Sequence, residues 1–135
     1  MSNLIVIDAS AFLTALFGNK TRVSQRLSTL LRDDAQNINI LTFTIIEFAN
    51  GVRFSTRNTE EADRIIGQVY ALQLPVLAIL PADMTAITRL SYRLSTTIYD
   101  TAYHYMALIR DGTFITCDKS YFKKAASLEH ITHWD

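Results

Sequence analysis

The sequence lacks the features on which several classes of protein depend. It has one cysteine, Cys117, so no disulfide can form within the chain, and a reducing compartment such as the cytoplasm is expected. No stretch approaches the roughly 20 apolar residues that a membrane-spanning helix needs. The 13 basic and 13 acidic side chains cancel, which argues against a strongly basic nucleic-acid coat protein but leaves room for a local basic patch. We therefore expect a soluble cytoplasmic protein with no membrane partner.

Glycine and proline are also scarce, at four and two residues, so most of the chain is expected to lie in regular helices and strands. The short apolar segment at the start has no basic leader and runs directly into Asp8, which is unlike a signal peptide. With 135 residues, 49% of them hydrophobic, the chain is expected to form a single domain over 1–135 with a sizeable core.

Apolar runs alternate with amphipathic segments along the whole chain. The expected strands are 4–7, 38–41, 76–80, 113–116 and a last edge strand at 130–132. The expected helices are 10–17, 21–34, 44–54, 59–74, 81–94, 99–111 and 119–126. This alternation predicts an α/β fold with a central, mostly parallel, twisted sheet of four to five strands flanked by helices.

Two acidic residues follow strands of this expected sheet. Asp8 ends the apolar run LIVI, and Asp118 stands two residues beyond Thr116. In open α/β sheets, functional sites lie outside the carboxyl ends of the strands. Asp8 has three possible explanations from sequence: a cap for the helix that begins near Ser10, an ion pair with a Lys or Arg, or a metal ligand. Asp118 is in the same way a candidate cap for the helix that follows it, a metal ligand, or both.

Two further acids are unusual because their neighbours are apolar. Glu47 lies within FTIIEFAN, and Asp100 lies within TIYDTAYHYMAL near the start of an expected helix. Glu47 would either pair with Arg53 or Arg89 or belong to a metal site, where it would bind the ion through water or orient a nucleophilic water. Asp100 would benefit from the helix dipole in any case.

Four carboxylates at one site suit a hard divalent cation, because Mg²⁺ and Mn²⁺ take oxygen ligands and keep several waters. Without a cation, the four charges would repel one another strongly. A zinc site is not expected, since the three histidines lack HExxH spacing and one cysteine makes no CxxC pair. Of these histidines, His104 lies one helical turn after Asp100, where it would either face the site or serve as a hydrogen-bonded structural residue.

Four segments follow one another in order: VIDASAFL, TIIEFANGVR, IYDTAYHYMAL and FITCDKSYFKKA. Together they resemble the motifs of the PIN domain family, and in particular those of the short VapC-type toxins of toxin–antitoxin pairs. The resemblance spans residues 4–126. The residues that match the family's acids and hydroxyl positions are Asp8, Ser10, Glu47, Asp100, Thr116 and Asp118.

The resemblance implies a PIN-like three-layer sandwich and a Mg²⁺- or Mn²⁺-dependent endoribonuclease. It implies that the four acids are catalytic and bind the metal. Ser10 and Thr116 would either hold a ligand carboxylate or a phosphate oxygen or be ordinary caps. Lys119, next to Asp118, is the best candidate for contact with RNA phosphate. An antitoxin whose tail fills the active-site groove, and a homodimer, are the implied protein partners. The chain departs from the family at His104, Tyr105 and Cys117, and the bulky pair Tyr121–Phe122 is expected to alter the substrate groove.

Other α/β phosphate enzymes fit the sequence less well. A phosphotransfer receiver domain would need an acidic pair beside the first strand and an Asp at the end of a middle strand, whereas VLAILPAD has no acid before Asp83. A phosphatase with an aspartyl nucleophile would need a second Asp where Ser10 stands. A non-catalytic PIN-fold module that binds RNA or protein stays open as the alternative.

Overall fold

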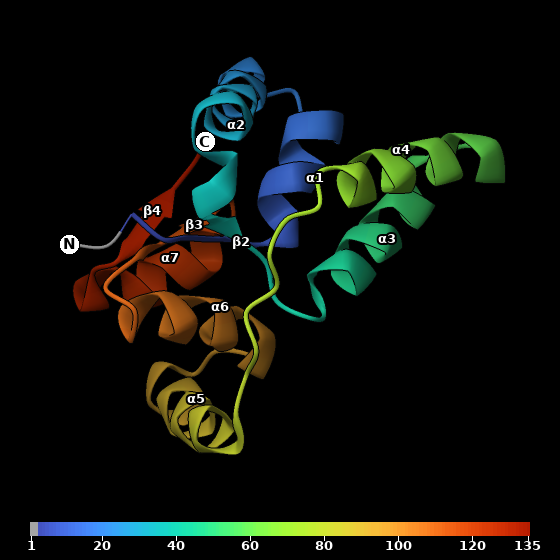
Figure 1. Cartoon of the computed structure of the whole chain (residues 1–135). Helices are drawn as coiled ribbons and strands as arrows, with labels where there is room; N and C mark the ends of the chain where they lie inside the picture. Colours follow the sequence, from blue (N-terminus) through green and yellow to red (C-terminus); the bar gives the residue numbers. More distant parts are fainter. Residues whose placement is uncertain (1–2) are drawn as a thin grey trace.

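The computed structural model describes residues 3–135, and within them one to four α-helices separate each strand from the next (Figure 1). The strands are β1 (Ile5–Ile7), β2 (Ile38–Asn39), β3 (Thr113–Thr116) and β4 (Ile131–His133). The α-helices are α1 (Ala9–Phe17), α2 (Thr21–Asp34), α3 (Thr44–Ser55), α4 (Thr59–Ala71), α5 (Pro81–Leu94), α6 (Ile98–Leu108) and α7 (Lys119–Ala125). Short 3-10 turns, η1 (Ala35–Asn37) and η2 (Ala126–Leu128), follow α2 and α7. Over residues 3–135, no helix combines the length and apolarity needed to cross a membrane.

The strands form one parallel sheet in the order β2-β1-β3-β4. In the central strand β1, Ile5 lies opposite Ile38 of β2 and Thr113 of β3. Because the strands are parallel, the carboxyl ends of β1 and β3 meet at the same edge. The prediction of a parallel α/β sheet is confirmed, and the last strand is an edge strand as expected.

The expected strand at 76–80 is wrong. In the described chain this segment makes one isolated bridge, between Ile40 and Val76, and then runs as an extended connection into α5. Two backbone bonds flank the bridge, from Ile40 N–H to Pro75 O and from Leu77 N–H to Ile40 O, both 2.9 Å long. The neighbouring chain turns into α3 directly afterwards, so the segment beyond Leu77 has no strand beside it.

Successive side chains of the strands point to opposite faces of the sheet and pack into two separate hydrophobic cores. Ile7, Ile38 and Ile115 pack on one face with residues of α1, α2, α3 and α4. Val6 and Phe114 pack on the other face with residues of α5, α6 and α7. The result is three layers, helix, sheet and helix, and Figure 1 shows α3 and α4 extending to one side while α5 lies beyond α6. This arrangement leaves the carboxyl ends of β1 and β3 between the starts of α1, α3, α6 and α7.

The turn from α6 into β3 brings two backbone segments very close together. Asp111 has φ of 51°, in the left-handed region, and Gly112 then leads into the strand. A Cβ atom on Gly112 would lie 2.5 Å from the carbonyl oxygen of Leu4. That same carbonyl accepts the first cross-strand bond, from Thr113 N–H at 3.0 Å. Glycine is therefore required here by close backbone approach.

We expect Gly112→Ala to lower the free energy of unfolding by about 1–3 kcal/mol, because the methyl group pushes β1 away from β3. The matched control is Gly67→Ala in the middle of α4, where a Cβ would meet no atom within 4 Å. That change should raise stability by about 0.4–1 kcal/mol, since alanine favours the helix over glycine. Urea unfolding followed by circular dichroism measures both. Equal effects in the two variants would contradict the account of Gly112.

Candidate active site

Asp8 is buried at the junction of β1 and α1, with 4% of its surface exposed. It is the N-cap of α1, where its Oδ1 accepts the backbone N–H of Ala11 at 3.1 Å. Ser10 Oγ donates to the same oxygen at 2.6 Å, and Thr116 Oγ1 donates to Oδ2 at 2.6 Å. No Lys or Arg of the described chain forms an ion pair with it. Of the explanations offered by sequence, the cap is found and the ion pair is not.

Ser10 and Thr116 bind backbone groups after β3 as well as the Asp8 carboxylate. Ser10 Oγ accepts the backbone N–H of Cys117 at 2.9 Å, and Thr116 Oγ1 accepts the N–H of Asp118 at 3.0 Å. Each hydroxyl therefore donates to Asp8 and accepts from the chain that leaves β3. The two hydroxyls fasten the start of α1 to the end of β3, and they set the position of Asp118 relative to Asp8.

Asp118 and Asp100 both stand at helix starts. Asp118 is the N-cap of α7 and accepts the N–H of Tyr121 at 3.0 Å. Asp100 lies in the first turn of α6, and its N–H donates to the N-cap side chain of Thr97 at 3.1 Å. The cap expected for Asp118 and the helix-start position expected for Asp100 are thus both present, and neither excludes a further role at the site.

Glu47 lies in the first turn of α3, half-buried. Its Oε1 accepts a hydrogen bond from the hydroxyl of Tyr103 at 2.7 Å. Neither Arg53 nor Arg89 pairs with it within residues 3–135, so the ion-pair alternative from sequence is not found. Tyr103 belongs to α6, and this bond therefore connects the helices that carry Glu47 and Asp100.

The carboxylates lie close enough for their charges to interact. Burial, opposed by hydrogen bonds from Ser10, Thr116 and Ala11 and assisted by the charge of Asp100, raises the pKa of Asp8 to about 6. Burial and the charge of Asp118 raise the pKa of Asp100. Burial and the charge of Asp100 raise that of Glu47, against the effect of the Tyr103 bond. Asp100 thus interacts with each of the other three acids.

The donor chemistry of the site fits a hard cation, since all four groups are carboxylates and their charges repel one another. As the side chains stand, however, no three Asp, Glu, His or Cys groups among the described residues are close enough to hold one ion directly. Mg²⁺ dehydrates reluctantly and usually keeps several waters. The arrangement therefore suits an ion held by one or two carboxylates, with the others reached through water.

Two predicted departures from the family prove to be structural. His104 is fully buried, with Nδ1 2.8 Å from the hydroxyl of Tyr121 and Nε2 2.7 Å from the carbonyl oxygen of Glu129. Both ring nitrogens bond groups other than the acids, and burial lowers the pKa of His104. Tyr121 is itself buried in the core of the α6 face, so it does not shape a substrate groove, whereas an effect of the half-buried Phe122 on such a groove stays a prediction. Lys119 is exposed beside Asp118, and its contact with RNA stays a prediction.

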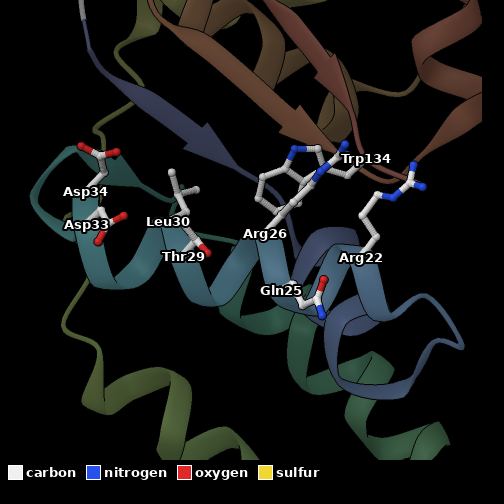
Figure 2. Close-up of a pocket in the computed structure, with 8 residues that line it drawn as sticks. All are labelled: Arg22, Gln25, Arg26, Thr29, Leu30, Asp33, Asp34 and Trp134. Atoms are coloured by element: carbon white, nitrogen blue, oxygen red, sulfur yellow. The ribbon is translucent and has the colours of Figure 1, made fainter.

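A separate hollow of about 330 Å³ lies along α2 (Figure 2). Arg22 and Arg26 lie toward one end of this stretch of α2 and Asp33 and Asp34 at the other, while Trp134 lines the hollow beside Arg26. None of the four candidate acids lines this hollow. It is therefore distinct from the candidate site.

Comparisons with known proteins support the fold. No family model and no curated protein matches the sequence. Among solved structures, PAE2754 from Pyrobaculum aerophilum is 23% identical with a TM-score of 0.73, over 98% of this chain and 90% of that chain. VapBC2 from Rickettsia felis, bound to promoter DNA, is 13% identical with a TM-score of 0.69, over 98% and 99%. VapBC-1 from nontypeable Haemophilus influenzae is 18% identical with a TM-score of 0.65, over 97% and 98%.

These likenesses, each over nearly the whole length of both chains, establish the class: the chain has a PIN-like α/β fold. Within that class, its neighbours include the VapBC structures. The resemblance to VapC-type PIN domains that four sequence motifs predicted is thus confirmed at the level of the fold.

Asp8→Asn should stabilise the protein at neutral pH, because the folded chain holds the Asp8 proton more tightly than an unfolded chain with the ordinary pKa of 3.8. The stabilising effect of this raised pKa is complete below about pH 4 and is lost as pH rises through 6. The loss is about 3 kcal/mol, at about 1.4 kcal/mol per tenfold change in proton affinity. Asparagine keeps an acceptor for Ser10 and Ala11 without the charge.

Urea unfolding of wild type and Asp8→Asn between pH 4 and 8 measures this effect. The variant's advantage should grow across pH 4–6 and level off above pH 7. The exposed Asp63→Asn on α4 is the matched control and should follow the wild type at every pH. A variant that is less stable than the wild type at pH 8 would show that Asp8 serves mainly as the α1 cap.

Proposed function

We propose that the protein is a Mg²⁺- or Mn²⁺-dependent endoribonuclease that acts as the toxin of a toxin–antitoxin pair. The observation that supports this proposal is that Asp100 interacts through its charge with three other carboxylates, each from a separate element of the chain. Three of the four acids have pKa values raised by burial and by one another's charge. A fold that gathers negative charge in this way favours the binding of a cation there.

In this proposal Asp8, Asp100 and Asp118 would hold the cation, directly or through water. A bound Mg²⁺ or Mn²⁺ would polarise the scissile phosphate and lower the pKa of an attacking water. Glu47, half-buried at the start of α3, would reach the ion through that water, orient the water and accept its proton. Lys119, exposed beside Asp118, would contact a phosphate of the RNA. Ser10 and Thr116 would keep Asp8 in place without touching the substrate.

The proposed protein partners follow from the resemblance to VapC-type toxins. They are a cognate antitoxin, which would occupy the site and block it, and a second copy of the chain. Structural neighbours named as VapBC support an antitoxin partner. A second candidate function is a non-catalytic PIN-fold module that binds RNA or protein. It is favoured by the absence, within the described residues, of three carboxylates close enough to share an ion directly.

Cleavage of RNA by the purified protein distinguishes these two functions. We expect cutting with Mg²⁺ or Mn²⁺, none in EDTA, and a loss of more than about 100-fold in Asp100→Asn, since even groups that only orient a metal ligand are worth about 10- to 100-fold. The assay measures the initial rate on labelled single-stranded and structured RNAs.

Asp63→Asn, which removes an exposed carboxylate from α4, is the control and should cut at the wild-type rate. Cutting that persists in EDTA would contradict a metal-dependent site. An absence of both cutting and any metal-induced rise in melting temperature would favour the non-catalytic module. Equal loss in Asp100→Asn and Asp63→Asn would show a general effect of charge on RNA binding.

A further inference from the structure

Tyr103 stands at the centre of a buried chain of hydrogen bonds that ends on Glu47. The backbone N–H of Leu41 donates to Thr44 Oγ1 at 2.9 Å. Thr44 Oγ1 lies 2.9 Å from the Tyr103 hydroxyl, which in turn lies 2.7 Å from Glu47 Oε1. Thr44 and Tyr103 are each 1% exposed. The chain thus runs through the interior from the loop after β2 to the edge of the candidate site.

The direction of these bonds follows from the protons available. An ionised Glu47 can only accept, so the Tyr103 hydroxyl donates its one proton to the carboxylate. Thr44 Oγ1 already accepts from the backbone, and its own proton is free to go to the Tyr103 oxygen. All three bonds therefore point the same way, and such aligned bonds polarise and strengthen one another. Burial raises the pKa of the Tyr103 phenol, which keeps it a donor.

The ring of Tyr103 is fixed as firmly as its hydroxyl. Its face stacks on Phe114 of β3, with centroids 5.6 Å apart and planes within 7° of parallel. Phe43 meets it at 73°, with centroids 5.2 Å apart. Because sheet and loop both hold the ring, the hydroxyl has little freedom to follow a moving carboxylate. Glu47 must instead adapt to Tyr103.

We propose that Tyr103 is a positioning residue, which holds Glu47 Oε1 so that Oε2 is presented to the water of the reaction. Within the described chain, Oε2 makes no hydrogen bond, so it is the oxygen left for that water. Tyr103 also follows Asp100 by three residues on α6. Because Tyr103 bonds Glu47, this one helix sets the position of Glu47 relative to Asp100. This inference rests on the proposed nuclease function.

The test compares Tyr103→Phe with Tyr121→Phe, its matched control. Both changes remove a buried tyrosine hydroxyl and keep the ring, but the Tyr121 hydroxyl bonds His104 and no carboxylate. We expect Tyr103→Phe to lower kcat about 10- to 100-fold with KM within twofold of wild type, the range found for groups that orient functional ligands. Tyr121→Phe should keep kcat within about twofold, and melting temperatures of the two variants should fall by similar amounts.

Variants of Thr44 test the chain beyond Tyr103. Thr44→Ser keeps the hydroxyl and should retain kcat. Thr44→Val removes it and should lower kcat in the direction of Tyr103→Phe, with no further loss when the two changes are combined, because they break the same chain. Additive losses, or a Thr44→Ser variant as slow as Thr44→Val, would overturn the inference. If Thr44→Val does not fold, Tyr103→Phe decides alone.

Binding of Mn²⁺, measured by calorimetry without RNA, separates failure of this inference from failure of the nuclease proposal. If the wild type cuts RNA and Tyr103→Phe cuts equally well, Tyr103 does not position Glu47, while the nuclease stands. If the wild type cuts no RNA, the nuclease proposal fails, and Tyr103 is then judged by Mn²⁺ affinity alone. Several-fold weaker binding in Tyr103→Phe, but not in Tyr121→Phe, would support positioning. Equal affinities, or no Mn²⁺ binding by the wild type, would overturn it.

Discussion

The placement of one buried carboxylate, that of Asp8, constrains the rest of the site. A charge that is 4% exposed needs hydrogen-bond donors, and the chain supplies them from α1 and from the end of β3. Ser10 and Thr116 meet this need and at the same time accept backbone N–H groups of the chain that leads to Asp118. The same bonds that accommodate the charge therefore bring a second acid to it. The hydrogen bonds that stabilise the buried Asp8 carboxylate therefore also assemble the site.

This arrangement costs stability, which argues for function. The pKa of Asp8 is raised to about 6 because burial outweighs all of its hydrogen bonds. Asp100 and Glu47 show upward shifts with the same leading cause. An apolar or amide side chain at these positions would avoid the repulsion. Sites at which a sequence accepts unfavourable electrostatics are where function is to be sought.

Much of this was open to prediction from the sequence, because it depends on local patterns. Strand periodicity is enough to predict that the run LIVI forms a buried strand ending at an acid. The preference of helix starts for Asp is enough to predict the caps at Asp8 and Asp118. The apolar residues of 76–80 predict a strand, but this pattern does not tell whether another strand lies beside the segment, and in the structure it makes one isolated bridge. The sequence does not predict the Tyr103 bond to Glu47, and it leaves open whether His104 faces the site or is a hydrogen-bonded structural residue. The partners in each case lie far along the chain, and only the packing of α6 brings them together.

The packing of α6 explains how separate patterns become one site. Most of this helix is buried, and two of its residues are bonded to different neighbours, Tyr103 to α3 and His104 to the turn before β4. With both side chains fastened, α6 has little freedom to rotate, and Asp100 in its first turn is carried to a set position beside the ends of β1 and β3. A histidine outside the chemistry thus contributes to the site by fixing the helix on which an acid stands.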